Sequence, residues 1–281
     1  MQTSLFSEPE GVVEAAPADA GLHALGQTLP ERLYLGTSSW NFPGWRGLVW
    51  DRDYPEATLA RFGLPAYARH PLFRTVCIDR SFYRPLAAAE YAEYAAQVPA
   101  GFRFMVKAPA QITDALVRDQ SGRGRARNPD FLNAELALRE FIEPVVAGLR
   151  EKLGAVVFQI SPLPEPWLAH VPELLEQLRS LLSVIPDLRA DAPDSVVAVE
   201  VRNAEWLKPQ FVEVLRESGA TYCLGLHANM PVIADQLPLL RALWPGPLVC
   251  RWNLHALHGA YGFEAARQRY EPYDRLVDED L

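Results

Sequence analysis

Seven short apolar runs, separated by segments long enough for helices, constrain the fold of this chain more than any other feature. Each run has the length of a strand and is rich in aliphatic and aromatic residues, as in Gly154–Ile160, GAVVFQI. Strands that alternate with helices predict a parallel sheet covered by helices, and at this number of strands a TIM (β/α)8-type barrel in the α/β class. The predicted strands begin near Leu33, Phe73, Phe102, Gly154, Ser195, Ala220 and Pro247.

The eighth strand of such a barrel has no counterpart in the sequence. Only 28 of the 281 residues follow Asn253, and they include several tyrosines but no β-branched run. We therefore predict a barrel that lacks its eighth strand, with a gap between the first and seventh strands. The aromatic residues of the C-terminal segment are expected to cover part of this gap.

The first 30 residues are rich in Ala, Pro, Glu and Gly and show no periodicity, which predicts a disordered tail over 1–30 and leaves 31–281 for the barrel. Within this tail, Gln2–Phe6 resembles the Gln-x-x-Leu-Phe peptide by which bacterial replication and repair proteins dock on the DNA sliding clamp. Such a peptide would place Leu5 and Phe6 in an apolar pocket. The alternative is that the pentapeptide is accidental.

Composition excludes several classes of protein. A net charge of −8 argues against a broadly basic surface for nucleic acid. No apolar run approaches the roughly 20 residues that span a membrane, and the first residues lack the pattern of a secretion signal, which favours the cytoplasm. Cys77, Cys223 and Cys250 lie within apolar runs and are expected to be reduced thiols of the core.

No cofactor and no metal is predicted. The sequence has no phosphate-cradling glycine motif, no Gly-x-Ser-x-Gly motif and no Cys-x-x-Cys pair. His255 and His258 share one loop and His227 lies in another, so their spacing does not define the three ligands of a zinc site.

Charged residues stand at the ends of several predicted strands. In the segment Ser195–Trp206, SVVAVEVRNAEW, Glu200 and Arg202 share one face because side chains alternate along a strand. Asp79 and Lys107 close the second and third strands in the same way. Active sites of parallel α/β barrels lie at the carboxyl ends of the strands, so we predict that these four side chains converge there as catalytic residues.

Other polar and aromatic residues near the strand ends are candidates for binding a substrate through stacking and hydrogen bonds. The alternative is an internal network of ion pairs that only satisfies the polar core of the barrel. The candidate substrate-binding residues are Trp40, Arg80, Tyr83, Gln159, Trp206, Arg251 and Asn253.

Two connections have distinctive composition. The segment Ala108–Pro129 contains four arginines and two glycines, and we expect an irregular surface loop that either is solvated or clamps phosphate. A helix is predicted from about Pro129 to Lys152, kinked or split by Pro144.

Several stretches together resemble the domain-of-unknown-function family 72, whose members form TIM barrels. They run in order from Leu33 to Trp206, with a weaker match in LVCRWNLHALHG, and are GTSSW, PGWRG, TVCIDRSFYRP, FRFMVKAPAQIT, LGAVVFQISP and VAVEVRNAEW. The resemblance implies the fold and no activity. The chain departs from the family pattern, which usually has Glu at the position of Cys77 and Asn at Asp79, and often His at Asp114 and Asn203.

Two functional interpretations follow. The first is an enzyme that acts on a small polar or anionic substrate, such as a sugar or a phosphate-bearing molecule, at the carboxyl end of the barrel. The second is a nucleic-acid-linked protein of DNA repair or binding, in which the arginines of Arg118–Arg127 contact the backbone and the N-terminal peptide docks on the clamp.

Overall fold

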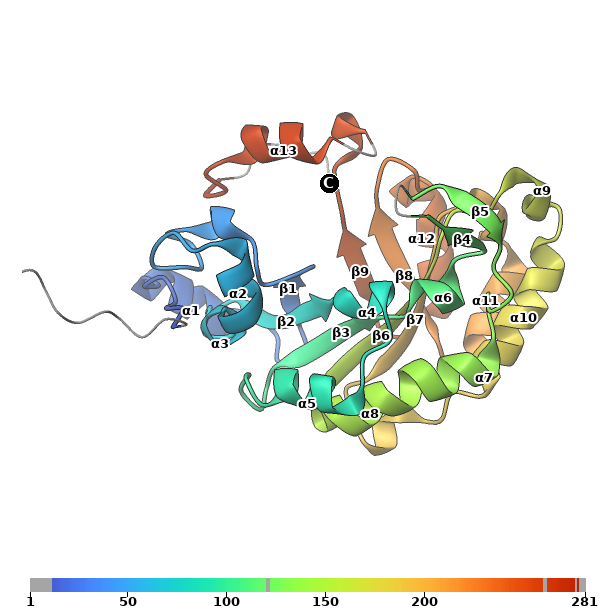
Figure 1. Ribbon diagram of the computed structural model, residues 1–281, viewed down its shortest axis with the longest axis horizontal. Coiled ribbons are helices and arrows are strands. Elements are labelled where there is room, and N and C mark those ends of the chain that lie inside the picture. The colour runs from blue at the N-terminus through green and yellow to red at the C-terminus, as the bar shows by residue number, and fades with distance from the viewer. Residues whose placement is uncertain (1–11, 120–121, 260–261, 276, 278–281) are drawn as a thin grey trace, which may run out of the picture.

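A computed structural model describes residues 12–119, 122–259, 262–275 and 277. Seven parallel strands form one curled sheet in the order β1-β2-β3-β6-β7-β8-β9, with helices on its outer side (Figure 1). The strands are β1 Leu35–Thr37, β2 Phe73–Ile78, β3 Arg103–Lys107, β6 Leu153–Ile160, β7 Val196–Val201, β8 Thr221–Leu226 and β9 Val249–Trp252. All seven predicted strands are thereby confirmed.

The two faces of the sheet follow the period of two in the sequence. On β7, Val199 and Val201 pack into the large core between sheet and helices. Ala198 points to the other face and packs with Val157 and Cys223 in a smaller cluster that fills the inside of the curled sheet. The same alternation directs Glu200 to the inside, as predicted.

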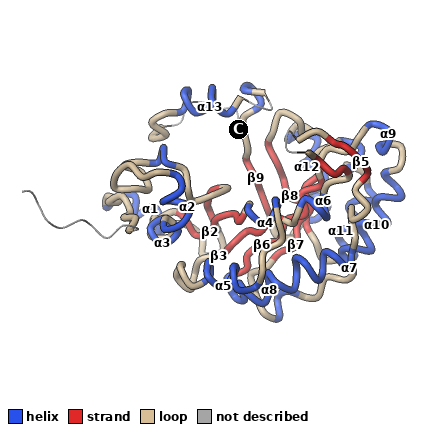
Figure 2. Tube along the Cα trace, viewed as in Figure 1, coloured by secondary structure: helices blue, strands red, loops and turns tan. Residues whose placement is uncertain are grey.

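The helices that cover the outer face of the sheet pack against it with an apolar stripe (Figure 2). In α10 the leucines at 174, 175, 178, 181 and 182 are buried, which is the spacing of one helical face. The longer helices are α1 Ala20–Thr28, α2 Glu56–Phe62, α5 Ala88–Ala95, α8 Glu143–Leu149, α10 Val171–Ser183, α11 Pro209–Glu217, α12 Ile233–Leu243 and α13 Phe263–Tyr270. Four-residue helices are α3 Leu64–Tyr67, α4 Arg80–Tyr83, α6 Ala110–Thr113, α7 Ala134–Ala137 and α9 Glu165–Leu168.

The sheet does not close into a complete barrel. Within the described residues β1 and β9 are its two edges, and no eighth strand joins them. Helix α13 follows β9 and lies across the top of the open side (Figure 1). Beyond it, Tyr273 meets the ring of Phe42 in an edge-to-face contact at 5.3 Å, and the Arg267 guanidinium lies 5.3 Å from the centre of the same ring. The predicted gap, and its partial cover by aromatic residues of the C-terminal segment, are therefore confirmed.

The prediction of a disordered tail over 1–30 is wrong from residue 12 onward. Asp19 caps α1 by accepting a hydrogen bond from the backbone of Leu22, and Val13 is buried against the core. Arg74 donates to the carbonyl oxygens of Gly26 and Pro30, which fixes the segment to β2. The helix was missed because its contacts are with distant residues and its own apolar pattern is weak. The clamp-like peptide Gln2–Phe6 lies outside the described residues.

Two connections differ in detail from their prediction. The arginine-rich segment contains a two-stranded antiparallel hairpin, β4 Leu116–Arg118 and β5 Gly124–Arg127, rather than an irregular loop. The helix predicted from Pro129 begins at Ala134 and is continuous rather than split around Pro144: a π-helical turn, Leu138–Ile142, precedes α8, whose second residue is the proline. Since proline has no N–H to donate, the widened turn removes the need for that hydrogen bond.

Candidate functional site

The inner face of the sheet carries a group of charged side chains near the carboxyl ends of its strands. Parallel register places Gln159 of β6 beside Glu200 of β7, and Gly225 of β8 beside Arg251 of β9. Lys107 is the last residue of β3, and Asp79 follows β2. We call this end of the curled sheet the mouth.

Glu200 is the centre of the mouth. Its side chain is completely buried, and its Oε2 accepts a 2.6 Å hydrogen bond from a guanidinium nitrogen of Arg251. A nitrogen of Arg202 lies 2.7 Å from Oε1, but outside hydrogen-bond alignment, so this contact is an ion pair only. The same nitrogen of Arg251 donates to Oε1 of Gln159 at 2.7 Å. Burial opposes the charge of Arg251, but the Glu200 carboxylate raises the pKa of Arg251 further, so the guanidinium stays charged.

Gly225 makes room for this network. It lies between Glu200 and Arg251 in the order of the strands, and it has no side chain to point into the mouth. A Cβ atom there would be 2.5 Å from Cε of Met230 and 3.7 Å from the Glu200 carboxyl carbon. The absence of a side chain on β8 therefore lets Arg251 reach across from β9 to β7 and β6.

Lys107 occupies a second part of the mouth. Its Nζ lies 4.0 Å from Oδ1 of Asp79 and 4.0 Å from the centre of the Phe82 ring. The hydroxyl of Ser81, which is buried, donates to the carbonyl oxygens of Lys107 and Ile78, and so holds α4 against the ends of both strands. Burial lowers the pKa of Lys107, and Asp79 opposes this shift.

Cys77 shares the inner face with Asp79 and Lys107. Its thiol donates to Oδ1 of Asp79 at 3.1 Å. Burial, together with the nearby carboxylate, raises the pKa of Cys77 well above its usual value, so this side chain is a neutral thiol. The expectation of free cysteines holds for all three.

The structure brings most of the predicted site residues to the mouth. The four candidate catalytic residues meet there, together with Gln159, Arg251 and Asn253, whose buried Nδ2 makes no hydrogen bond within the described residues. Arg80 and Tyr83 are exposed on α4, beside the Lys107 contact. The catalytic and binding roles of all these residues stay predictions.

Of the two predicted tryptophans, Trp206 is too deeply buried to contact a substrate, and the binding role of Trp40 stays a prediction. Trp206 is completely buried among helix-facing residues, 6.0 Å from the ring of Phe211, because its turn folds back behind the sheet. Trp40 donates from its indole nitrogen to the carbonyl of Ala60 and packs edge-on against Tyr94 of α5, so it belongs to the outer layer.

Sequence reasoning missed Phe82 and Ser81 as members of the site. Phe82 and Ser81 were visible only as part of the turn after β2, and nothing in their spacing indicated the contacts to Lys107. His227 follows β8, and its Nδ1 accepts from the backbone N–H of Asn229. Burial, followed by the charge of Arg202, lowers the pKa of His227, so the ring is neutral near pH 7.

Positions at which the chain departs from the family pattern have structural roles here. The Asp114 carboxylate is buried and binds Nε of Arg118 at 2.5 Å and the backbone of Leu116 at 3.0 Å. The side-chain oxygen of Asn203 accepts from the backbone N–H of Leu163. These side chains fix loops at the rim of the mouth.

The arginines of the β4–β5 hairpin are largely engaged. Arg118 pairs with Asp114, Arg125 pairs with Asp119, and the Arg127 guanidinium lies 5.1 Å from the ring centre of Trp167. The interpretation that this segment binds nucleic acid stays a prediction, with two of its cations already neutralised by carboxylates.

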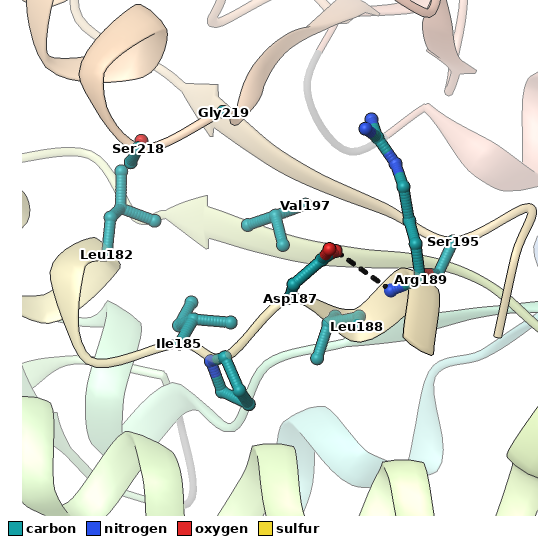
Figure 3. A pocket seen from close by; sticks show the side chains of 10 residues that line it. Leu182, Ile185, Asp187, Leu188, Arg189, Ser195, Val197, Ser218 and Gly219 are labelled. Carbon is teal, nitrogen blue, oxygen red and sulfur yellow. Dashed lines mark hydrogen bonds between the residues drawn. The ribbon is translucent and has the colours of Figure 1, made fainter. Parts of the chain in front are cut away.

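A cavity of about 290 Å³ lies at the opposite end of the sheet from the mouth. Leu182, Ile185, Ser195 and Val197 are among its lining residues, where β7 begins (Figure 3). Its lining includes one carboxylate, that of Asp187, and one guanidinium, that of Arg189, but none of the predicted site residues. Over the described residues there is also no group of three or more His, Cys, Asp or Glu side chains that could hold a metal.

Comparison with known proteins gives a family and structural relatives. A family model described as "Protein of unknown function DUF72" matches residues 34–276. A crystal structure of a DUF72 family protein from Thermotoga maritima is similar at 17% identity, with 86% of this chain and 99% of that chain covered and a TM-score of 0.46. One from Enterococcus faecalis is similar at 18% identity, with coverage of 76% and 94% and a TM-score of 0.41. No curated protein matches the chain. No helix in the described part of the chain has the length and apolar character that a membrane crossing requires.

Proposed function

Since the chain belongs to the DUF72 family, whose description states no activity, we propose from its own residues that the mouth binds a small anionic substrate and acts on it as an enzyme. The observation that carries this proposal is an excess of positive charge and of hydrogen-bond donors. Among the described residues, three cations at the mouth, on Lys107, Arg202 and Arg251, pair with two carboxylates, on Asp79 and Glu200. A protein with a net charge of −8 has therefore gathered cations at one internal site.

In the described part of the chain, several donors of the mouth make no hydrogen bond, and one acceptor there, Oε1 of Glu200, has only an ion pair. Among the described residues, Nζ of Lys107 and Nδ2 of Asn253 make no hydrogen bond, and Arg202 has an ion pair without hydrogen-bond alignment. Buried donors without acceptors are costly, and a phosphate or carboxylate group would satisfy several of them at once. This supports an anionic rather than a neutral substrate.

The burial of each residue suggests its role in binding and catalysis. Glu200 is fully buried and holds Arg251, so we assign it the role of positioning the guanidinium groups. Asp79 is about one-third exposed and close to Lys107, so these two are suited to proton transfer with a bound substrate. Arg80 and Tyr83 are placed to contact the exposed part of a ligand.

Titration calorimetry with inorganic phosphate and with citrate, at constant ionic strength, tests the binding step. We expect a saturable signal that Arg202→Met weakens by about tenfold to a hundredfold, the value of one charge-assisted hydrogen bond. Arg189→Met is the matched control, because Arg189 is exposed at the other end of the sheet. Absence of binding, or equal loss in both variants, would remove the basis of the proposal.

A further inference from the structure

Lysine is rare in this chain, and one of its lysines lies in the mouth. Of the 27 Lys and Arg residues only three are lysines, Lys107, Lys152 and Lys208. Lys152 donates to the carbonyl oxygens of Ala95 and Val98, and Lys208 is exposed at the start of α11. Every other cation is an arginine, which cannot be deprotonated in a protein. The use of lysine at position 107 therefore points to amine chemistry and not to charge alone.

We propose that the Lys107 amine attacks the carbonyl carbon of a small aldehyde or ketone that carries an anionic group, and forms a covalent imine with it. This inference rests on the proposed function, because the anionic group would be held by Arg202 and Arg251. It adds the substrate class, an anionic carbonyl compound, and the type of intermediate.

The surroundings of Nζ suit a nucleophile. One side of Nζ faces the Phe82 ring at 4.0 Å, and Asp79 is 4.0 Å away on another. No hydrogen bond in the described part of the chain occupies Nζ, and the residue is 8% exposed, so the amine is both desolvated and reachable. Desolvation or a neighbouring cation is the usual way in which a lysine becomes a nucleophile.

The electrostatic setting supports the same role. Burial lowers the pKa of Lys107 below its usual 10.5; Asp79 opposes this shift, while the charge of Arg251 adds to it. A lower pKa means a larger fraction of neutral amine near pH 7, which is the form that attacks a carbonyl.

The step balances without an additional reactant. The lone pair of Nζ forms the C–N bond while the C=O π pair moves to oxygen, and a first proton passes from nitrogen to that oxygen to give a hydroxyl. The hydroxyl compound then loses water as the second nitrogen proton is transferred. Asp79 can accept the proton that leaves nitrogen and return it to the departing hydroxyl. One amine and one carbonyl thus yield one imine and one water, and hydrolysis reverses the step.

Reductive trapping tests the inference on the full chain. The protein is incubated with sodium cyanoborohydride and pyruvate, dihydroxyacetone phosphate or acetone, and the modified lysine is located by peptide mass spectrometry. We expect a reduced adduct on Lys107 with the two anionic carbonyl compounds and much less with uncharged acetone. Lys152 and Lys208 serve as internal controls and should stay unmodified.

Two variants separate the possible outcomes. Lys107→Arg keeps the positive charge but cannot form an imine, so it should bind phosphate and show no adduct; Lys107→Met should lose the adduct and part of the binding. If phosphate binds but Lys107 is not labelled, or is labelled no more than Lys208, the imine is refuted and the proposed function stands. If neither binding nor labelling occurs, both are refuted.

Discussion

Glu200→Gln tests whether burial makes the charged network of the mouth important for stability. The change keeps the shape of the side chain and removes its charge. Glu200 has no exposed surface, and the side chains of Arg251 and Arg202 are 8% and 10% exposed. Among the described residues, Glu200 is the one carboxylate paired with these two guanidinium groups, and water can replace it poorly in this buried place.

The size of the effect follows from that burial. Breaking a buried ion pair by removing one partner costs about 3–5 kcal/mol, because a charge stays buried without compensation. The amide oxygen of the variant can still accept from Arg251, which retains about 1 kcal/mol. We expect the free energy of unfolding to fall by about 2–4 kcal/mol, measured by urea unfolding with tryptophan fluorescence.

Glu217→Gln is the matched control. Glu217 accepts from Nε of Arg179 at 2.8 Å, a distance close to that between Glu200 and Arg251, but its side chain is 57% exposed. An exposed pair contributes about 1 kcal/mol or less, so this variant should be nearly neutral. Equal losses of stability in the two variants would show that burial does not determine the strength of the network.

The remaining predictions concern Lys107 in the mouth and the two edge strands of the sheet. Lys107→Met should raise the free energy of unfolding at pH 7 by about 1–2 kcal/mol, because it removes a buried charge while Asp79 can still be solvated. Lys152→Met is the control and should lower the free energy of unfolding, because it loses two hydrogen bonds to carbonyl oxygens. The pKa of Lys107 in the folded protein lies below its usual 10.5, so between the folded and unfolded pKa values the unfolded chain binds more protons than the folded one. The unmutated protein therefore gains stability as pH rises through this range, and the extra stability of Lys107→Met should shrink. Hydrogen exchange should be faster in β1 and β9, the unpaired edges, than in β7, and equal protection would contradict the open-edge architecture.

Patterns along single strands could be predicted from the sequence, and contacts between distant turns could not. The alternation in Val197–Val201 was sufficient to place Glu200 on the inner face, because a strand offers only two faces. Trp206 was misplaced because it lies in a turn, where no period fixes the direction of a side chain. Helix α1 was missed for a similar reason, since the hydrogen bonds from Arg74 that hold it come from 44 to 48 residues away.

The edge strand β9 and the charged mouth depend on the same residue. Within the part of the chain that the structure describes, β9 has a strand neighbour on one side, and its four residues give it few backbone hydrogen bonds. Arg251 compensates by bonding to Glu200 and Gln159, two strands and three strands away across the inside of the sheet. The charged side chain of Arg251 thus links the edge strand to the centre of the sheet, and these hydrogen bonds offset the cost of burying its charge. By mass action, any ligand that bound the remaining donors of Arg251 would stabilise β9 as well, so occupation of the mouth and order at the edge of the sheet are thermodynamically linked.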